Sequence, residues 1–105
     1  MKLEQAVIDI VREDVAKFVK EKIAKTISQI DGIPQEKVKY NPNESLHVLG
    51  FDDLDAADLA IDAEDKFKIL IDEDDKTLYG MSENTLIVYL TKKVIAREEE
   101  KPEYV

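Results

Sequence analysis

The sequence contains no cysteine and no tryptophan, and only three glycines and three prolines among its 105 residues. Without cysteine, the chain has no disulfide bonds, no thiolate metal ligands and no cysteine nucleophile. No apolar run approaches the roughly 20 residues that a membrane-spanning helix needs. Four acidic side chains among residues 1–14 interrupt any signal-peptide segment. These absences predict a cytoplasmic protein without a membrane span.

Acidic residues are in excess, and the excess lies in one stretch of the chain. The net charge is −9; residues 52–75 hold eleven acids and two lysines, whereas the rest of the chain holds thirteen acids and thirteen bases. Such a field repels nucleic acid and anionic lipid and speeds encounter with basic protein surfaces. The stretch therefore predicts protein partners with basic docking patches and no nucleic acid. A solvated helix face that keeps the protein soluble is the simpler alternative, and it stays open.

The first 30 residues have the apolar periodicity of an amphipathic helix. The apolar side chains recur every three or four residues: Leu3, Val7, Ile10, Val11, Val15, Phe18, Val19, Ile23, Ile27 and Ile30. Gly32 follows as a helix stop. The pattern predicts either one long helix or two helices that meet near Asp14. An amphipathic segment at 1–30 is also a candidate for self-association or for binding a partner.

The remaining residues predict an all-α protein. Residues 32–51 contain the turn-forming glycines, prolines and asparagines and form a long loop, which suggests either a function or an order imposed by neighbours. Helices are expected near residues 17–30, 52–67, 73–79 and 83–98, the last capped by Ser82. The predicted core is Ile23, Ile27, Ile30, Val38, Leu46, Leu49, Leu54, Ile61, Phe67, Ile71, Leu86 and Leu90.

Residue patterns that would indicate catalysis or metal binding are weak. His47 is the only histidine, and a lone histidine in an apolar loop is more often structural than catalytic. A calcium loop starting at Asp72 has Lys76 where an oxygen ligand belongs and Thr77 where the turn needs glycine. No nucleophile-and-base pattern is present. We therefore expect no catalytic residues, no metal ligands and no enzymatic activity.

One motif is specific. Residues 49–75 read LGFDDLDAADLAIDAEDKFKILIDEDD, which resembles the acyl carrier proteins and their signature LG-x-DSLD-x-x-EL, followed by acids, a Phe and an Ile. Residues 32–38, GIPQEKV, resemble the turn that ends the family's first helix. The resemblance implies an acyl-carrier-like four-helix bundle of three main helices and one short one, with a long first loop. It divides the chain into an N-terminal helical extension (1–16), a carrier-like domain (17–96) and a polar tail (97–105).

The motif departs from the family at its central position. The family attaches a 4'-phosphopantetheine arm to the serine of its DSL triplet, and this triplet here is Asp52-Asp53-Leu54. A carboxylate at Asp53 cannot replace the serine hydroxyl, so no cofactor is expected on this sequence. At the first turn of a helix, an aspartate is stabilised by the helix dipole, which accounts physically for its tolerance there.

The resemblance also implies how the protein acts. In the family, the acidic second helix docks onto basic patches of synthases, transferases and hydrolases of fatty-acid or polyketide-type biosynthesis. The corresponding residues here are Asp52, Leu54, Asp55, Asp58, Asp62, Glu64 and Asp65. We therefore predict a carrier-like protein that has lost its arm and acts in recognition, regulation or scaffolding. Two alternatives are a working carrier whose natural residue 53 is serine, and a structural subunit that binds through its N-terminal helix.

Overall fold

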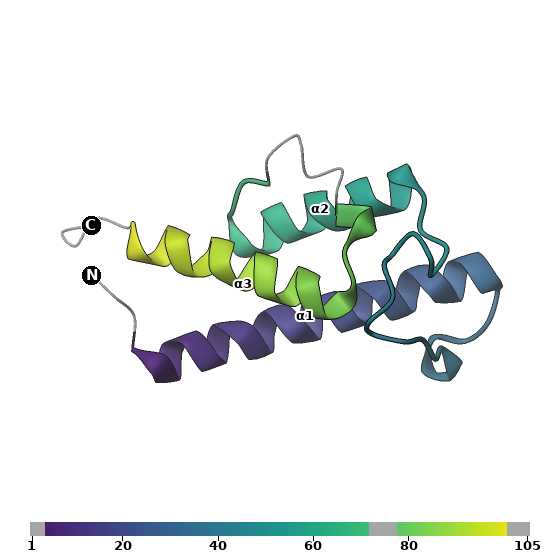
Figure 1. Cartoon of the computed structure of the whole chain (residues 1–105), viewed down its shortest axis with the longest axis horizontal. Coiled ribbons are helices and arrows are strands. Elements are labelled where there is room, and N and C mark those ends of the chain that lie inside the picture. Colours follow the sequence, from purple (N-terminus) through teal and green to yellow (C-terminus); the bar gives the residue numbers. More distant parts are fainter. Residues whose placement is uncertain (1–3, 72–77, 101–105) are drawn as a thin grey trace.

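In the residues that the structure describes, three α-helices pack together, and a long loop joins the first two (Figure 1). The computed structural model describes residues 4–71 and 78–100. Its elements are α1 (Gln5–Asp31), the short 3-10 helix η1 (Gln35–Lys37), α2 (Asp53–Phe67) and α3 (Glu83–Glu99). Across the described ranges there is no β-strand, only an isolated bridge between Ser45 and Ser82, so the all-α prediction is confirmed. The predicted short helix at 73–79 lies mostly outside the described residues.

Helix α1 is a single element of 27 residues, about 40 Å long at 1.5 Å per residue. No break occurs near Asp14, which excludes the two-helix alternative, because no glycine or proline interrupts the apolar stripe. The helix ends at Gly32, whose φ of 67° is left-handed and whose backbone N–H donates to the carbonyl of Ser28. Helix α1 therefore runs without interruption through the boundary proposed between the extension and the carrier-like domain.

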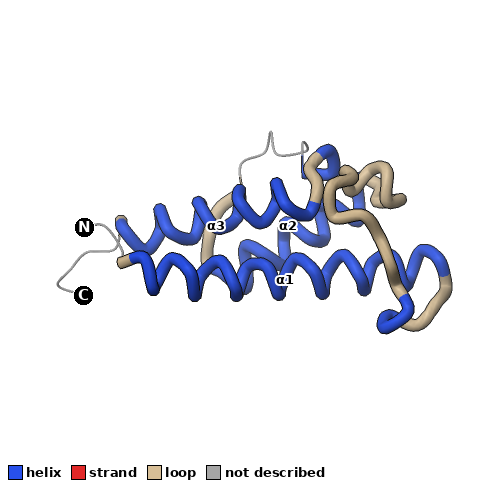
Figure 2. Tube along the Cα trace, turned by 60° about the horizontal axis from the view of Figure 1, so that its bottom comes forward, coloured by secondary structure: helices blue, strands red, loops and turns tan. Residues whose placement is uncertain are grey.

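Helices α1 and α3 run antiparallel and lie side by side along the length of the molecule (Figures 1 and 2). The start of α1 and the end of α3 lie at one end, and the long loop lies at the other. The shorter helix α2 starts at the loop end and runs in the same direction as α3. This arrangement places the first turn of α2 next to the loop that carries the LGFDD motif.

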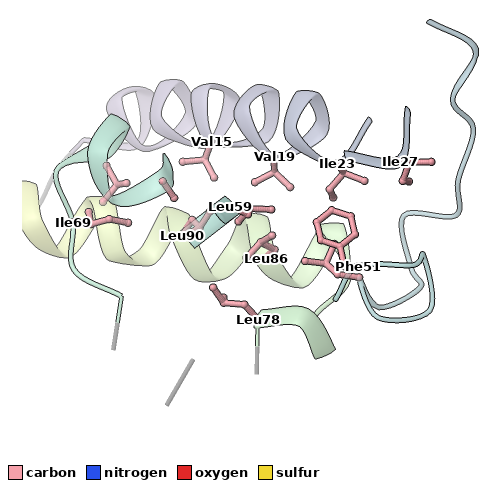
Figure 3. Close-up of a cluster of buried hydrophobic side chains, with 13 residues drawn as sticks. Val15, Val19, Ile23, Ile27, Phe51, Leu59, Ile69, Leu78, Leu86 and Leu90 are labelled. Atoms are coloured by element: carbon pink, nitrogen blue, oxygen red, sulfur yellow. The ribbon is translucent and has the colours of Figure 1, made fainter. Parts of the chain in front are cut away.

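The core is formed by one stripe of α1 against α2 and α3 (Figure 3). Its buried members are Val15, Val19, Ile23, Ile27, Leu46, Phe51, Leu59, Ala63, Ile69, Leu78, Leu86, Leu90 and Val94. Five predicted core residues are among them: Ile23, Ile27, Leu46, Leu86 and Leu90. Four others are only partly buried against the core: Val38, Leu49, Phe67 and Ile71.

Three core predictions are wrong. The side chains of Ile30, Leu54 and Ile61 are 44%, 79% and 56% exposed. In α2 the error is one of helical phase, because Leu54 and Ile61 lie on the face opposite to the buried Ala56, Leu59 and Ala63. Ile30 lies in the last turn of α1, close to the long loop: a Cβ added at Gly50 would lie 3.8 Å from its side chain.

The long loop is ordered by bonds to the segment that precedes α3 and to the first turn of α3. The backbone N–H of Leu46 donates to the carbonyl of Met81 at 2.9 Å, and that of His47 donates to the carbonyl of Tyr79 at 2.7 Å. Asn84 Nδ2 donates to Asn43 Oδ1 at 2.7 Å. Of the two explanations for a loop this long, order imposed by neighbours is the one that these bonds support.

A search for membrane spans gave a negative result for the described residues: none of their helices is both long enough and apolar enough to cross a bilayer.

Candidate docking surface and attachment position on helix α2

The backbone of the first turn of α2 is held by a buried residue before it and by a capping box within it. Gly50 takes a φ of 106°, a conformation that other residues rarely adopt, and the next side chain, Phe51, is buried in the core. Asp52 then caps the helix: its Oδ1 accepts from the N–H of Asp55 at 2.8 Å, and Asp55 Oδ2 accepts from the N–H of Asp52 at 3.1 Å. This reciprocal capping box satisfies two helix-end N–H groups.

Asp53 is the first residue of α2, and it is exposed. It follows a buried anchor and a capped turn, so its backbone is held firmly while its side chain faces solvent. Within the described residues, no hydrogen bond or ion pair involves the Asp53 carboxylate. Residue 53 is therefore exposed on a fixed backbone, as an attachment residue must be, but its side chain is a carboxylate and not a hydroxyl. A phosphorylated carboxylate is an acyl phosphate, which water hydrolyses, so this side chain would not keep a phosphodiester-linked arm.

Two further predicted residues, Asp58 and Asp62, share one cation from α1. Lys22 Nζ lies 3.2 Å from Asp58 Oδ2 and also forms an ion pair with Asp62 Oδ2. The Lys22 side chain is only 14% exposed, whereas those of Asp58 and Asp62 are 69% and 41% exposed. Burial alone lowers the pKa of Lys22, but the hydrogen bonds and charges of Asp62 and Asp58 outweigh it and raise that pKa above its ordinary value.

The other end of α2 uses a carboxylate in a structural bond. Glu64 Oε2 accepts from the backbone N–H of Ile71 at 2.8 Å and so holds the chain that leaves the helix. Asp65, one residue further, is exposed and has no hydrogen bond or ion pair in the part of the chain that the structure describes. Of the six carboxylates predicted to dock a partner, five thus have internal partners and Asp65 has none among the described residues.

The outward face of α2 also carries apolar side chains. Leu54 and Ile61 are 79% and 56% exposed, and Ala57 between them is exposed as well. Residues seven apart lie on the same side of a helix, so these side chains form a ridge. We call Leu54, Ala57 and Ile61 the apolar ridge of α2. The sequence analysis also predicts Leu54 as a docking residue, and its exposure leaves it accessible to a partner.

A buried polar contact at the start of α3 was not predicted from the sequence. The hydroxyl of Tyr40 donates to Glu83 Oε1, and Glu83 is 4% exposed. Burial, together with the hydrogen bond to Glu83 and the charge of Glu83, raises the pKa of Tyr40 above its ordinary range. The two residues are 43 positions apart, and Glu83 reads as an ordinary first-turn acid of a helix. Only the three-dimensional arrangement of the loop reveals the pair.

His47 lies in the long loop, where its side chain makes an aromatic contact. The His47 ring packs edge-on against Tyr79 with centroids 5.2 Å apart, beside an open hollow of about 510 Å³. The nearby hydroxyl of Ser45 accepts from the backbone N–H of Val48 at 3.2 Å. Over residues 4–71 and 78–100, no three or more His, Asp or Glu side chains are grouped so as to hold a metal ion.

Comparison with known proteins gave one match. The family model described as "Phosphopantetheine attachment site" matches residues 21–77. The match includes the C-terminal part of α1 from residue 21 onward, the long loop and all of α2, and therefore the first turn with Asp53. The comparisons with curated proteins and with solved structures found no match.

Proposed function

The chain belongs to the family of the phosphopantetheine attachment site, whose model covers more than half of its residues, and from this premise we propose that it is a carrier-like protein that works without the arm. Acyl-carrier-type domains of this family are carrier proteins, not enzymes, and they interact with enzymes. The observation that carries the proposal is Asp53, which is exposed on the first turn of α2; the resemblance of residues 49–75 to the family's signature is the reason for aligning it with the family's serine.

The proposed role is recognition, regulation or scaffolding through the outward face of α2. The apolar ridge gives a partner a surface to bury, and the surrounding carboxylates favour a partner with basic residues. Synthases, transferases or hydrolases of lipid or polyketide-type biosynthesis in the cytoplasm are the proposed partners. Such complexes are small and transient, and electrostatic attraction mainly sets their association rate.

Mass spectrometry of the intact chain tests this function. The parent and an Asp53→Ser variant are incubated with coenzyme A and a phosphopantetheinyl transferase. We expect no mass change in the parent and one added arm per chain in the variant, because serine supplies the hydroxyl that attacks the pyrophosphate of coenzyme A. An arm on the parent would contradict the assignment of the site. If the Asp53→Ser variant also stayed unmodified, the chain would resemble a carrier in its fold alone.

Two other functions are consistent with particular observations. A working carrier whose natural residue 53 is serine would share every other feature of the first turn of α2, and sequencing of the source gene distinguishes it. A structural subunit that pairs through α1 is favoured by Val7 and Ile10, which are 40% and 59% exposed near the start of that helix. Sedimentation of the full chain over a range of concentrations would reveal such self-association.

A further inference from the structure

Lys22 is unusual among the charged residues because a lysine is seldom shielded from solvent. Its side chain is only 14% exposed, and its ammonium group lies against Asp58 and Asp62. These two aspartates are four residues apart, so they lie one helical turn from each other on α2. Both are also among the residues expected to dock a partner. One cation of the protein therefore already occupies the place that a partner's cation would take.

The two ends of the same face are different. Asp53 at the start of α2 and Asp65 near its end have no ion pair in the described residues, and both are exposed. The apolar ridge lies between them, with Leu54 and Ile61 as its largest side chains. The surface thus has open carboxylates at its ends, apolar groups along its length and, beside its middle, two carboxylates that share one internal cation and are partly neutralised by it.

We propose that Lys22 is an internal counter-ion that closes the middle of the α2 surface to a partner's cations and so determines which partners bind. The proposal rests on the function proposed above. The partner that fits is a protein helix with two apolar side chains between two terminal cations. Asp53 and Asp65 are twelve residues apart, which is about 18 Å along a helix, and Leu54 and Ile61 are seven apart, which is about 10 Å. The partner helix would therefore carry its two cations about twelve residues apart and its two apolar side chains about seven residues apart.

Competition is the physical reason for this selectivity. A cation that approaches Asp58 or Asp62 gains little unless it displaces Lys22, and displacement breaks a pair that is already formed. A cation that approaches Asp53 or Asp65 displaces only water. Ion pairs at exposed positions are individually weak, so we expect differences of about two- to fivefold in dissociation constant for each cation that is moved.

Two synthetic helical peptides of identical composition test the proposal on the full chain. Both carry leucines seven residues apart; one has arginines twelve residues apart at its ends, and the other has the arginines between the leucines. Dissociation constants are measured by calorimetry at low salt for the parent, Lys22→Met and Lys20→Met. Lys20 is exposed on the same helix, so its variant has the same net charge as Lys22→Met without loss of the pair. Lys22→Gln replaces Lys22→Met if circular dichroism shows that the latter has lost helicity.

We expect the parent and Lys20→Met to prefer the end-charged peptide by about two- to fivefold, and Lys22→Met to lose that preference through tighter binding of the middle-charged peptide. Equal binding of the two peptides to the parent, or equal effects of the two lysine variants, would overturn the role of Lys22 and leave the docking function intact. If no protein binds either peptide, the basic partner of the proposed function is wrong, and the inference falls with it.

Discussion

The two faces of α2 have similar amounts of apolar side chain but opposite environments. On the inward face, Leu59 and Ala63 are fully buried in the core. On the outward face, Leu54 and Ile61 are 79% and 56% exposed, and acidic residues flank them. The inward face holds the helix to the bundle, whereas the outward face contributes little to folding. The comparison teaches that only the inward set of apolar residues on this helix serves stability.

The largest expected effect is on the inward face. Truncation of Leu59 to alanine removes a fully buried side chain and leaves a cavity, so it should lower the free energy of unfolding by about 2–5 kcal/mol. The same truncation at Leu54 removes atoms that are mostly in water, so it should change that free energy by less than about 0.5 kcal/mol. Urea denaturation of both variants measures the two values. Similar losses of unfolding free energy in the two variants would contradict the difference between the two faces and show that Leu54 packs against the protein in solution.

The assignment of these two faces is also where sequence reasoning reached its limit. The stripe of α1 and the apolar residues of α3 were predictable, because each pattern has one clear phase. Helix α2 has two apolar sets, Leu54 with Ile61 and Leu59 with its neighbouring alanines, and periodicity alone does not say which faces inward. Alanine is a weak signal of burial in a pattern, yet Ala56 and Ala63 are buried on the same side of the helix as Leu59.

The candidate site was predictable in its position but not in its internal contacts. The helix that the sequence predicts near residues 52–67 begins at Asp53, so local sequence located the first turn of α2 to within one residue. The ion pairs of Lys22 join residues 36 or more positions apart, and the Tyr40–Glu83 bond spans 43. Such contacts depend on how the helices pack, and residue type gives no indication of them. A protein with many acids offers many equivalent partners for each base.

The comparison of buried and exposed groups extends to polar contacts. Tyr40→Phe removes the hydroxyl that donates to the buried Glu83 and leaves a carboxylate oxygen without that donor. Loss of a partner from a buried charged group should lower the free energy of unfolding by about 1–3 kcal/mol. Tyr79→Phe is the control: it also removes a tyrosine hydroxyl, but one that is not bonded to Glu83, and its ring keeps the edge-on packing with His47. Thermal denaturation of both variants gives the difference, and equal losses would contradict a special role for the buried pair.

The same contact predicts a pH dependence at the alkaline end. The pKa of Tyr40 is raised in the folded protein relative to its ordinary value of about 10. The unfolded chain therefore loses the tyrosine proton first, and the stabilisation is complete below pH 10 and falls as pH rises above it. Stability of the parent should decline more steeply above pH 10 than that of Tyr40→Phe. Parallel curves of stability against pH for the two proteins would show that the pKa of Tyr40 is not raised and that its hydrogen bond to Glu83 is not formed in solution.

The smallest expected effect is the stability change of Asp53→Ser, and it sharpens the comparison at the residue that decides the proposed function. The carboxylate gains from the helix dipole at the first turn, so its loss should cost less than about 1 kcal/mol and should diminish with added salt. Asp52→Ala is the matched control: it removes the capping oxygen that accepts from the N–H of Asp55 and should cost about 0.5–2 kcal/mol. Urea denaturation at low and high salt gives both values. A negligible cost for Asp53→Ser would mean that the fold accepts serine as readily as aspartate, so that stability does not explain the missing hydroxyl. A cost equal to that of Asp52→Ala at both salt concentrations would mean that Asp53 serves the fold, and the absence of the serine would then carry no information about recognition.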